Sequence, residues 1–135
     1  MPKALVARKE RVYISHFLNK ITYNVATFGE ADVDYYAAEY AAFRAMRCAF
    51  RVYRAFEKDA RENRRWVEAG GKCTVPSMVL SGEFSRHRED ALEMAREVVN
   101  DRVVEEGVVE GATHYLAQEN PGGFVQAVSR FLDRN

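Results

Sequence analysis

Apolar positions recur every three or four residues through the first half of the chain, the spacing that is typical of amphipathic helices. Residues 4–21 predict the first such helix, with charged side chains on the opposite side. A turn is expected at Thr27-Phe28-Gly29, because glycine tolerates a positive φ angle. An aromatic stripe then runs from about residue 31 to 62, and it fits one long helix or two helices that share a face. Gly70-Gly71 is predicted to end the helical region.

The second half of the chain alternates short β-branched runs with helical patterns. Residues 74–82 predict a buried strand, residues 89–100 an amphipathic helix, and residues 103–110 a second strand. Asn120 has the side chain of a good N-cap, and Pro121 suits the first position of a final helix. The order β-α-β-α predicts parallel strands, because a helix makes the crossover between them.

The change of pattern near residues 69–73 divides the chain into a helical region, residues 1–69, and a β-α-β-α region, residues 70–135. We therefore predict a helix-rich α/β fold. Two parallel strands are too few for a stable sheet, because such a pair needs helices on both faces and neighbouring strands along its edges. The sequence predicts an incomplete sheet.

Composition and charge narrow the class of protein. The 135 residues are enough for one domain, and a hydrophobic content of 47% is enough for a core. Twenty basic residues balance twenty acidic ones, and no basic run exceeds Arg64-Arg65, so a nucleic-acid partner is not expected. No apolar run approaches the roughly 18 to 20 residues of a membrane span, and no signal peptide is evident. We expect a cytoplasmic protein without a membrane partner.

The sequence contains no motif that is typical of a metal or cofactor site. Cys48 and Cys73 fall in no paired motif and are expected to be reduced thiols. No spacing of His, Cys and carboxylates is typical of a metal site, and no glycine loop is typical of phosphate binding. We predict neither a metal nor a cofactor.

Candidate chemistry is concentrated after the second predicted strand. A β-branched run leads through Gly111 to His114, and Asn120-Pro121 then opens a helix, so His114 is predicted on a loop beyond the carboxyl end of a strand. In open α/β folds this edge is where ligands bind. Spacing alone would also fit an ordinary exposed loop histidine.

The loop resembles the histidine loop of α/β-hydrolases with helical caps, the branch that contains epoxide hydrolases and haloacid dehalogenases. The family usually has Gly-His-Trp/Tyr-Leu, an acidic pair and then Pro; here Thr113 stands in place of the glycine and Gln118 in place of one acid. Three other stretches resemble this family in the same order. They are similar to the first cap helix, the later cap helices and the penultimate core strand: residues 13–17, 40–56 and 73–83. The chain thus resembles the C-terminal half of a capped α/β-hydrolase.

The resemblance implies a two-step hydrolysis. In the family an aspartate attacks the epoxide and forms an ester, and two cap hydroxyls hydrogen-bond the developing alkoxide. A histidine then activates water to hydrolyse the ester. Carried over to this sequence, His114 is the general base, and Tyr13 and Tyr53 are the proton donors. Without the resemblance, tyrosines on apolar stripes would be read as core residues.

Several parts of the family pattern differ here. The chain contains no glycine-rich nucleophile elbow. The orienting acid usually follows the penultimate strand as Gly-x-x-Asp, where this sequence has Ser85 at the acid position and Glu83 as a weak substitute. Another branch takes this acid from an earlier strand. In the cap, Phe43-Arg44 replaces the usual Pro-Gly break, which favours one continuous helix and would move Tyr53 relative to Tyr13.

The first functional hypothesis is the C-terminal half of an epoxide-hydrolase-like enzyme, inactive alone, that would act on an epoxide-like small molecule once completed. A haloacid dehalogenase-like hydrolase is the alternative within the enzyme class, although its cap usually supplies a His-Trp pair where this sequence has Tyr13-Ile14. A different class is a non-catalytic interaction protein, or remnant, whose open sheet edge binds a complementary N-terminal half or a second copy of the chain. A small α-rich domain with an unrelated role also remains open.

Overall fold

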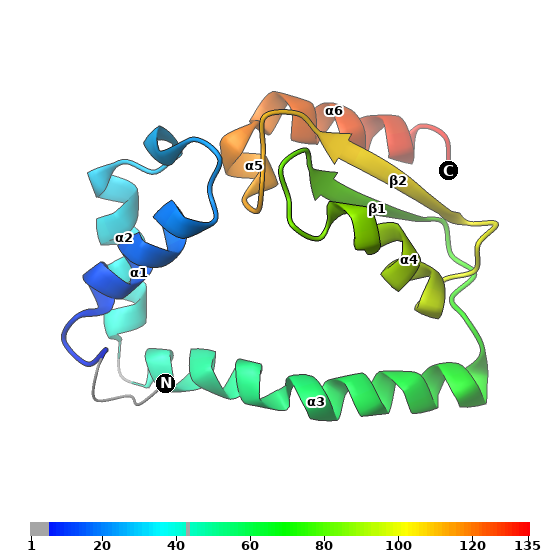
Figure 1. The fold of residues 1–135 in the computed structure, drawn as a ribbon, viewed down its shortest axis with the longest axis horizontal. Helices are drawn as coiled ribbons and strands as arrows, with labels where there is room; N and C mark the ends of the chain where they lie inside the picture. Colours follow the sequence, from blue (N-terminus) through cyan, green and yellow to red (C-terminus); the bar gives the residue numbers. More distant parts are fainter. Residues whose placement is uncertain (1–5, 43) are drawn as a thin grey trace. The chain divides into compact units, whose positions relative to one another are not determined.

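The computed structural model describes residues 6–42 and 44–135 (Figure 1). In chain order the elements are α1 (Glu10–Lys20), the 3-10 helix η2 (Val25–Thr27), α2 (Glu30–Ala41), α3 (Ala45–Gly70), β1 (Ser77–Gly82), α4 (Arg88–Val98), β2 (Val104–Val109), α5 (Leu116–Glu119) and α6 (Pro121–Leu132). The chain forms two compact units. The helical unit comprises the described residues up to Lys20 together with Phe28–Trp66, and the α/β unit comprises Ile21–Thr27 together with Val67–Asn135.

The core of the helical unit lies between α1 and α2. Ile14 and Leu18 are the buried residues of α1, and Val33 and Ala37 are those of α2. This matches the helical spacing of apolar residues in the sequence. On the polar side of the same pair, Arg11 donates hydrogen bonds to the carboxylates of Glu30 and Asp34.

The aromatic stripe forms two helices, which is one of the two alternatives that the sequence left open. The continuous helix from about 31 to 62, which Phe43-Arg44 favoured, is not observed. Helix α2 ends at Ala41 and α3 begins at Ala45. Between them Arg44 has a φ of 70°, in the left-handed region that disfavours residues with a Cβ atom. Phe43, on which the prediction also rested, lies outside the described residues.

Packing on α1 explains why the stripe breaks. Phe50 of α3 is buried and meets the ring of Tyr13 on α1 edge-on, with ring centroids 6.0 Å apart. Ala37 is one of the buried residues of α2, the helix that packs against the same short helix α1. In a straight helix these two residues would lie about 20 Å apart along the axis. A break is what allows both to pack against α1.

Helix α1 is shorter than the sequence predicts. The pattern begins at residue 4, but the helix begins at Glu10. Arg8 has a φ of 63°, and its N–H donates to Glu10 Oε1 at 3.1 Å, so the chain turns immediately before the helix. Residues 1–5 lie outside the described part of the chain.

The α/β unit contains the predicted parallel pair of strands. Ser77 pairs with Val104 at one end and Gly82 with Val109 at the other. Helix α4 makes the crossover, and Figure 1 shows α4 and α6 on opposite sides of the pair. The fold is therefore the helix-rich α/β arrangement that the sequence predicts, with a two-stranded sheet.

The final helix begins as its sequence predicts. The Asn120 side chain accepts a hydrogen bond from the Gly123 N–H at 2.9 Å, and Pro121 is the first helical residue. The short helix α5 directly precedes this cap and was not evident from the pattern.

The core of the α/β unit is small. Val109 and Ala112 are 1% and 0% exposed, whereas several large apolar side chains on α4 and α6 are more than half exposed: Met94, Val125 and Leu132. One pair of strands offers little surface for these helices to cover. Among the described residues, no helix combines the length and the apolar character that a membrane span requires.

Candidate active site

The loop after β1 and the loop after β2 touch through their backbones. A Cβ atom on Gly82 would lie 2.3 Å from the Thr113 carbonyl oxygen and 2.5 Å from that of Ala112, so only glycine fits there. The Phe84 N–H donates to the Ala112 carbonyl at 3.0 Å. This close approach fixes the base of the loop that carries His114.

Glu83 holds the turn that follows β2. Gly111 has a φ of 65°, and its N–H donates to Glu83 Oε2 at 2.9 Å. Within the described residues, the Glu83 carboxylate makes no hydrogen bond to the His114 imidazole. Its observed contact is with the backbone of the loop, and its role as an orienting acid stays a prediction.

His114 is exposed, on the loop beyond the carboxyl end of β2. The ring of Tyr115 meets it edge-on, with centroids 5.1 Å apart. No hydrogen bond or carboxylate contact to the imidazole is present in the described part of the chain. An exposed imidazole is accessible to a water molecule, which is what a general base that activates water requires.

Glu119 organises the backbone around His114. Its Oε1 atom accepts hydrogen bonds from three successive N–H groups, those of Thr113 at 3.1 Å, His114 at 3.1 Å and Tyr115 at 2.9 Å. The Thr113 hydroxyl lies 3.0 Å from both carboxylate oxygens. The carboxylate thus determines the conformation of the histidine loop.

The pKa of the Glu119 carboxyl reflects these contacts. Partial burial by itself would raise the pKa. The backbone N–H groups of Tyr23, Tyr115 and Thr113 and the Thr113 hydroxyl favour the charged form and outweigh burial, so the pKa lies below its ordinary value. The loop is therefore held by an ionised carboxylate at neutral pH.

A segment from the first part of the chain is joined to this loop. The Tyr23 N–H donates to Glu119 Oε2 at 2.7 Å, and the Thr113 hydroxyl lies 2.9 Å from the Ile21 carbonyl oxygen. The Tyr23 ring stacks on that of Phe84, with centroids 4.2 Å apart and planes 10° from parallel. Residues 21–23 thus belong to the surroundings of the histidine loop.

Our reading of the sequence missed Glu119 as a functional residue, although a signal for it exists. Glu119 occupies one of the two acid positions in the α/β-hydrolase pattern, and Gln118 occupies the other. Gln118 is exposed, whereas Glu119 is half-buried and turned toward the loop. The replaced acid is therefore the one that is not needed to hold His114.

The two candidate proton donors lie in the helical unit. Burial raises the pKa of the Tyr13 phenol, and the nearby hydroxyls of Tyr53 and Tyr40 raise it further, which places the two predicted donors in one electrostatic environment. Tyr53 itself is 60% exposed. The Tyr13 phenol is therefore protonated at neutral pH, as a hydrogen-bond donor must be.

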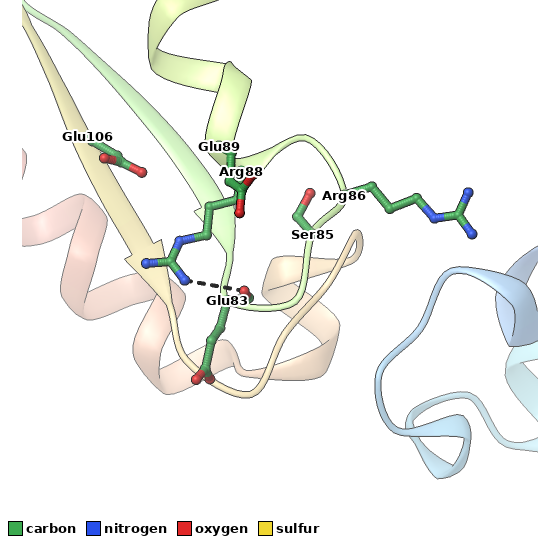
Figure 2. Close-up of a pocket in the computed structure, with 6 residues that line it drawn as sticks. All are labelled: Glu83, Ser85, Arg86, Arg88, Glu89 and Glu106. Carbon is green, nitrogen blue, oxygen red and sulfur yellow. Dashed lines mark hydrogen bonds between the residues drawn. The ribbon is translucent and has the colours of Figure 1, made fainter.

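An open polar pocket lies beside the carboxyl end of β1 (Figure 2). It has a volume of about 580 Å³. Its lining residues are all polar or charged: Glu83, Ser85, Arg86, Arg88, Glu89 and Glu106. Figure 2 shows the Arg88 guanidinium donating to the Glu83 carbonyl oxygen, at 3.4 Å, while Arg86 extends away from the pocket.

The pocket contains the position at which the family pattern has its orienting aspartate. Ser85 occupies it, and its hydroxyl accepts from the His87 N–H at 3.4 Å. A serine cannot supply the negative charge that stabilises an imidazolium. Elsewhere in residues 6–42 and 44–135, no three His, Cys, Asp or Glu side chains are grouped to hold a metal ion.

No protein-family model and no curated protein matches the sequence. Solved structures do resemble the fold. The Cfl2 protein of Burkholderia cenocepacia is 25% identical with a TM-score of 0.88, and the match covers 97% of this chain and 43% of that one. The Cif epoxide hydrolase of Acinetobacter nosocomialis is 22% identical with a TM-score of 0.87, covering 96% and 40%. The epoxide hydrolase CorEH is 23% identical with a TM-score of 0.80, covering 97% and 45%.

These comparisons confirm the resemblance to capped α/β-hydrolases at the level of the fold. The chain matches the solved structures over nearly all of its own length but spans less than half of theirs. This coverage is consistent with the C-terminal half of an α/β-hydrolase. The small sheet and the uncovered apolar residues of α4 and α6 agree with such a part.

Proposed function

We propose that this chain is the cap and histidine-bearing part of an epoxide-hydrolase-type α/β-hydrolase that acts on a small epoxide. His114 activates the water that hydrolyses an alkyl-enzyme ester, and Tyr13 and Tyr53 donate hydrogen bonds to the epoxide oxygen as the ring opens. The single observation that carries the proposal is the histidine loop. Its exposed imidazole stands beyond the end of β2 on a backbone held by the Glu119 carboxylate.

The paired tyrosines support the same reaction. Ring opening places negative charge on the epoxide oxygen, and two phenols aimed at this oxygen lower the barrier. The electrostatic interaction between Tyr13 and Tyr53 places the two phenols near each other, as two donors to one oxygen must be. The similar solved structures include proteins described as epoxide hydrolases, which favours an epoxide over other substrates.

The nucleophile is proposed to come from outside these 135 residues. Neither strand of the described chain passes directly into a helix, because five residues separate β1 from α4 and six separate β2 from α5. The described residues therefore lack the sharp turn on which the nucleophile of this fold is displayed. An aspartate supplied by a complementary half would attack the epoxide carbon. The chain by itself is accordingly proposed to be inactive.

Two measurements test this function. The purified chain is incubated with styrene oxide, and diol formation is followed; we expect none above the rate without protein. Turnover by the pure chain that disappears in His114→Ala would show that the proposed dependence on a second half is wrong.

The second measurement uses the chain mixed with a complementary half that bears the nucleophile, and it follows the ester formed on that half. We expect His114→Gln to accumulate the ester, seen by mass spectrometry as an added substrate mass. Tyr13→Phe and Tyr53→Phe should instead slow ester formation, and Tyr35→Phe, at an exposed position outside the proposed site, serves as the control. Normal turnover in His114→Gln would exclude it as the general base.

A non-catalytic interaction protein is the second candidate, and the exposed aromatic residues of α3 favour it. Tyr53, Phe56 and Trp66 are 60%, 55% and 60% exposed. Large exposed apolar side chains promote association with another chain. Sedimentation of the purified protein separates the candidates in part, because a strictly monomeric species would argue against binding to a second copy.

A further inference from the structure

We propose that Glu119 is a latch that couples the conformation of the histidine loop to the segment Ile21–Tyr23. This deepens the proposed function on which it rests, because the loop carries His114. The latch makes the conformation of the general-base loop depend on where this segment is held. Glu119 acts here as a positioning residue, without contact to substrate.

The two oxygens of the Glu119 carboxylate accept hydrogen bonds from different segments of the chain, and this observation supports the proposal. Oε1 accepts from the loop, from the N–H groups of Thr113, His114 and Tyr115. Oε2 accepts from the Tyr23 N–H at 2.7 Å, the shortest of these backbone contacts. Both sets are charge-assisted bonds, which are about twice as strong as neutral ones. One side chain therefore holds two segments that are far apart in the sequence.

The Thr113 hydroxyl also contacts both Glu119 and the segment Ile21–Tyr23. The glycine that the family pattern has at this position would lack this hydroxyl. Its hydroxyl lies 2.9 Å from the Ile21 carbonyl oxygen and 3.0 Å from each oxygen of Glu119. The hydroxyl has one proton for these three acceptors, and the charged carboxylate is the strongest of them. The Thr113 hydroxyl thus lies within hydrogen-bond distance of both Glu119 and Ile21.

The latched segment is the link that directly follows helix α1, which ends at Lys20. A displacement of this segment that pulls Tyr23 away removes one donor from Glu119 and loosens the hold on the loop. Coupling of this kind is reciprocal, so loosening the loop must also release the segment.

The test measures backbone amide exchange by NMR in the full 135-residue chain. In Glu119→Gln, which keeps the side-chain size but removes the charge, we expect exchange of the Tyr23 and His114 amides to accelerate together by about tenfold or more. Gln118→Ala changes the neighbouring exposed residue and should leave both rates unchanged. Acceleration of the His114 amide alone, with Tyr23 unchanged, would overturn the coupling.

A second variant changes Tyr23, whose N–H binds the other oxygen of the Glu119 carboxylate. Tyr23→Ala removes the stacking on Phe84 from an exposed position, so the unit should still fold. We expect the His114 amide to exchange several-fold faster at an unchanged unfolding temperature. An unchanged His114 rate would overturn the proposal even if Glu119→Gln fails to fold. Neither measurement involves turnover, so their failure is distinguishable from failure of the hydrolase function, which the diol and ester assays test.

Discussion

The Tyr23 N–H donates to the Glu119 carboxylate at 2.7 Å, although 96 positions separate the two residues in the sequence. The contact belongs to a set of bonds that favour the charged form of Glu119. It therefore links the conformation of the histidine loop to the ionisation of one carboxyl.

The first prediction concerns pH. Because the folded-state pKa of Glu119 lies below its unfolded value of about 4.5, the stabilisation is present above that pH. It is lost as the pH falls through the folded-state pKa. We expect the unfolding temperature of the wild-type chain to fall more steeply below pH 4.5 than that of Glu119→Gln, followed by circular dichroism. Parallel curves for the two proteins would show that Glu119 does not contribute through its charge.

The second prediction concerns the contact between the two loops. In Gly82→Ala the new methyl group would overlap the carbonyl oxygens of Ala112 and Thr113. These are backbone atoms, so a change of side-chain rotamer cannot relieve the overlap. We expect a loss of about 1 to 3 kcal/mol in the free energy of unfolding, measured in urea.

Gly122→Ala is the matched control for this substitution. A Cβ atom there would meet only Asn120 Oδ1, at 3.9 Å, and the residue lies in the first turn of α6. Alanine should be neutral or stabilising by up to about 1 kcal/mol. Equal effects at the two glycines would mean that backbone contact is not the reason for Gly82.

Local patterns predicted the elements, whereas contacts distant in the sequence determined the site. The Asn120 cap and the parallel strands follow from spacing and residue type, and both are observed. The latch joins Glu119 to Tyr23, and no periodicity in the sequence relates these positions. Glu119 could have been selected only through the acidic pair of the family pattern, since its role depends on where the chain folds back.

The third prediction concerns the titration of Tyr13. Burial and the neighbouring Tyr53 and Tyr40 raise the folded-state pKa of this phenol above its ordinary value of 10.0. We expect the ultraviolet titration of the folded chain to lose its most alkaline component in Tyr13→Phe. Tyr35→Phe, which removes a 65% exposed phenol, should leave this component in place.

The same shift has a consequence for stability. A raised folded-state pKa means that the contribution of Tyr13 is present below pH 10 and is lost as the pH rises through the folded-state pKa. Removing Tyr53 as well should bring the Tyr13 titration closer to the ordinary value. A titration of Tyr13 that does not respond to Tyr53→Phe would contradict the proposed pairing of the two donors.

The fourth prediction concerns the break between α2 and α3, which sets where Tyr53 lies relative to Tyr13. Arg44 has a φ of 70°, a conformation that costs alanine roughly 1 kcal/mol and glycine almost nothing. Arg44→Gly and Arg44→Ala both remove the arginine side chain, so any contact it makes cancels in the comparison. We expect the glycine variant to be more stable by about 1 kcal/mol in urea unfolding.

At Arg51, in the interior of α3, the order should be reversed. Glycine in a helix interior is about 1 kcal/mol less favourable than alanine, so Arg51→Ala should be more stable than Arg51→Gly. If alanine were also favoured at position 44, this residue would be helical in solution and the stripe would continue unbroken into α3. Helix α1 could then not pack against both Ala37 and Phe50, and the contact of Tyr13 with Phe50 would be lost together with its approach to Tyr53.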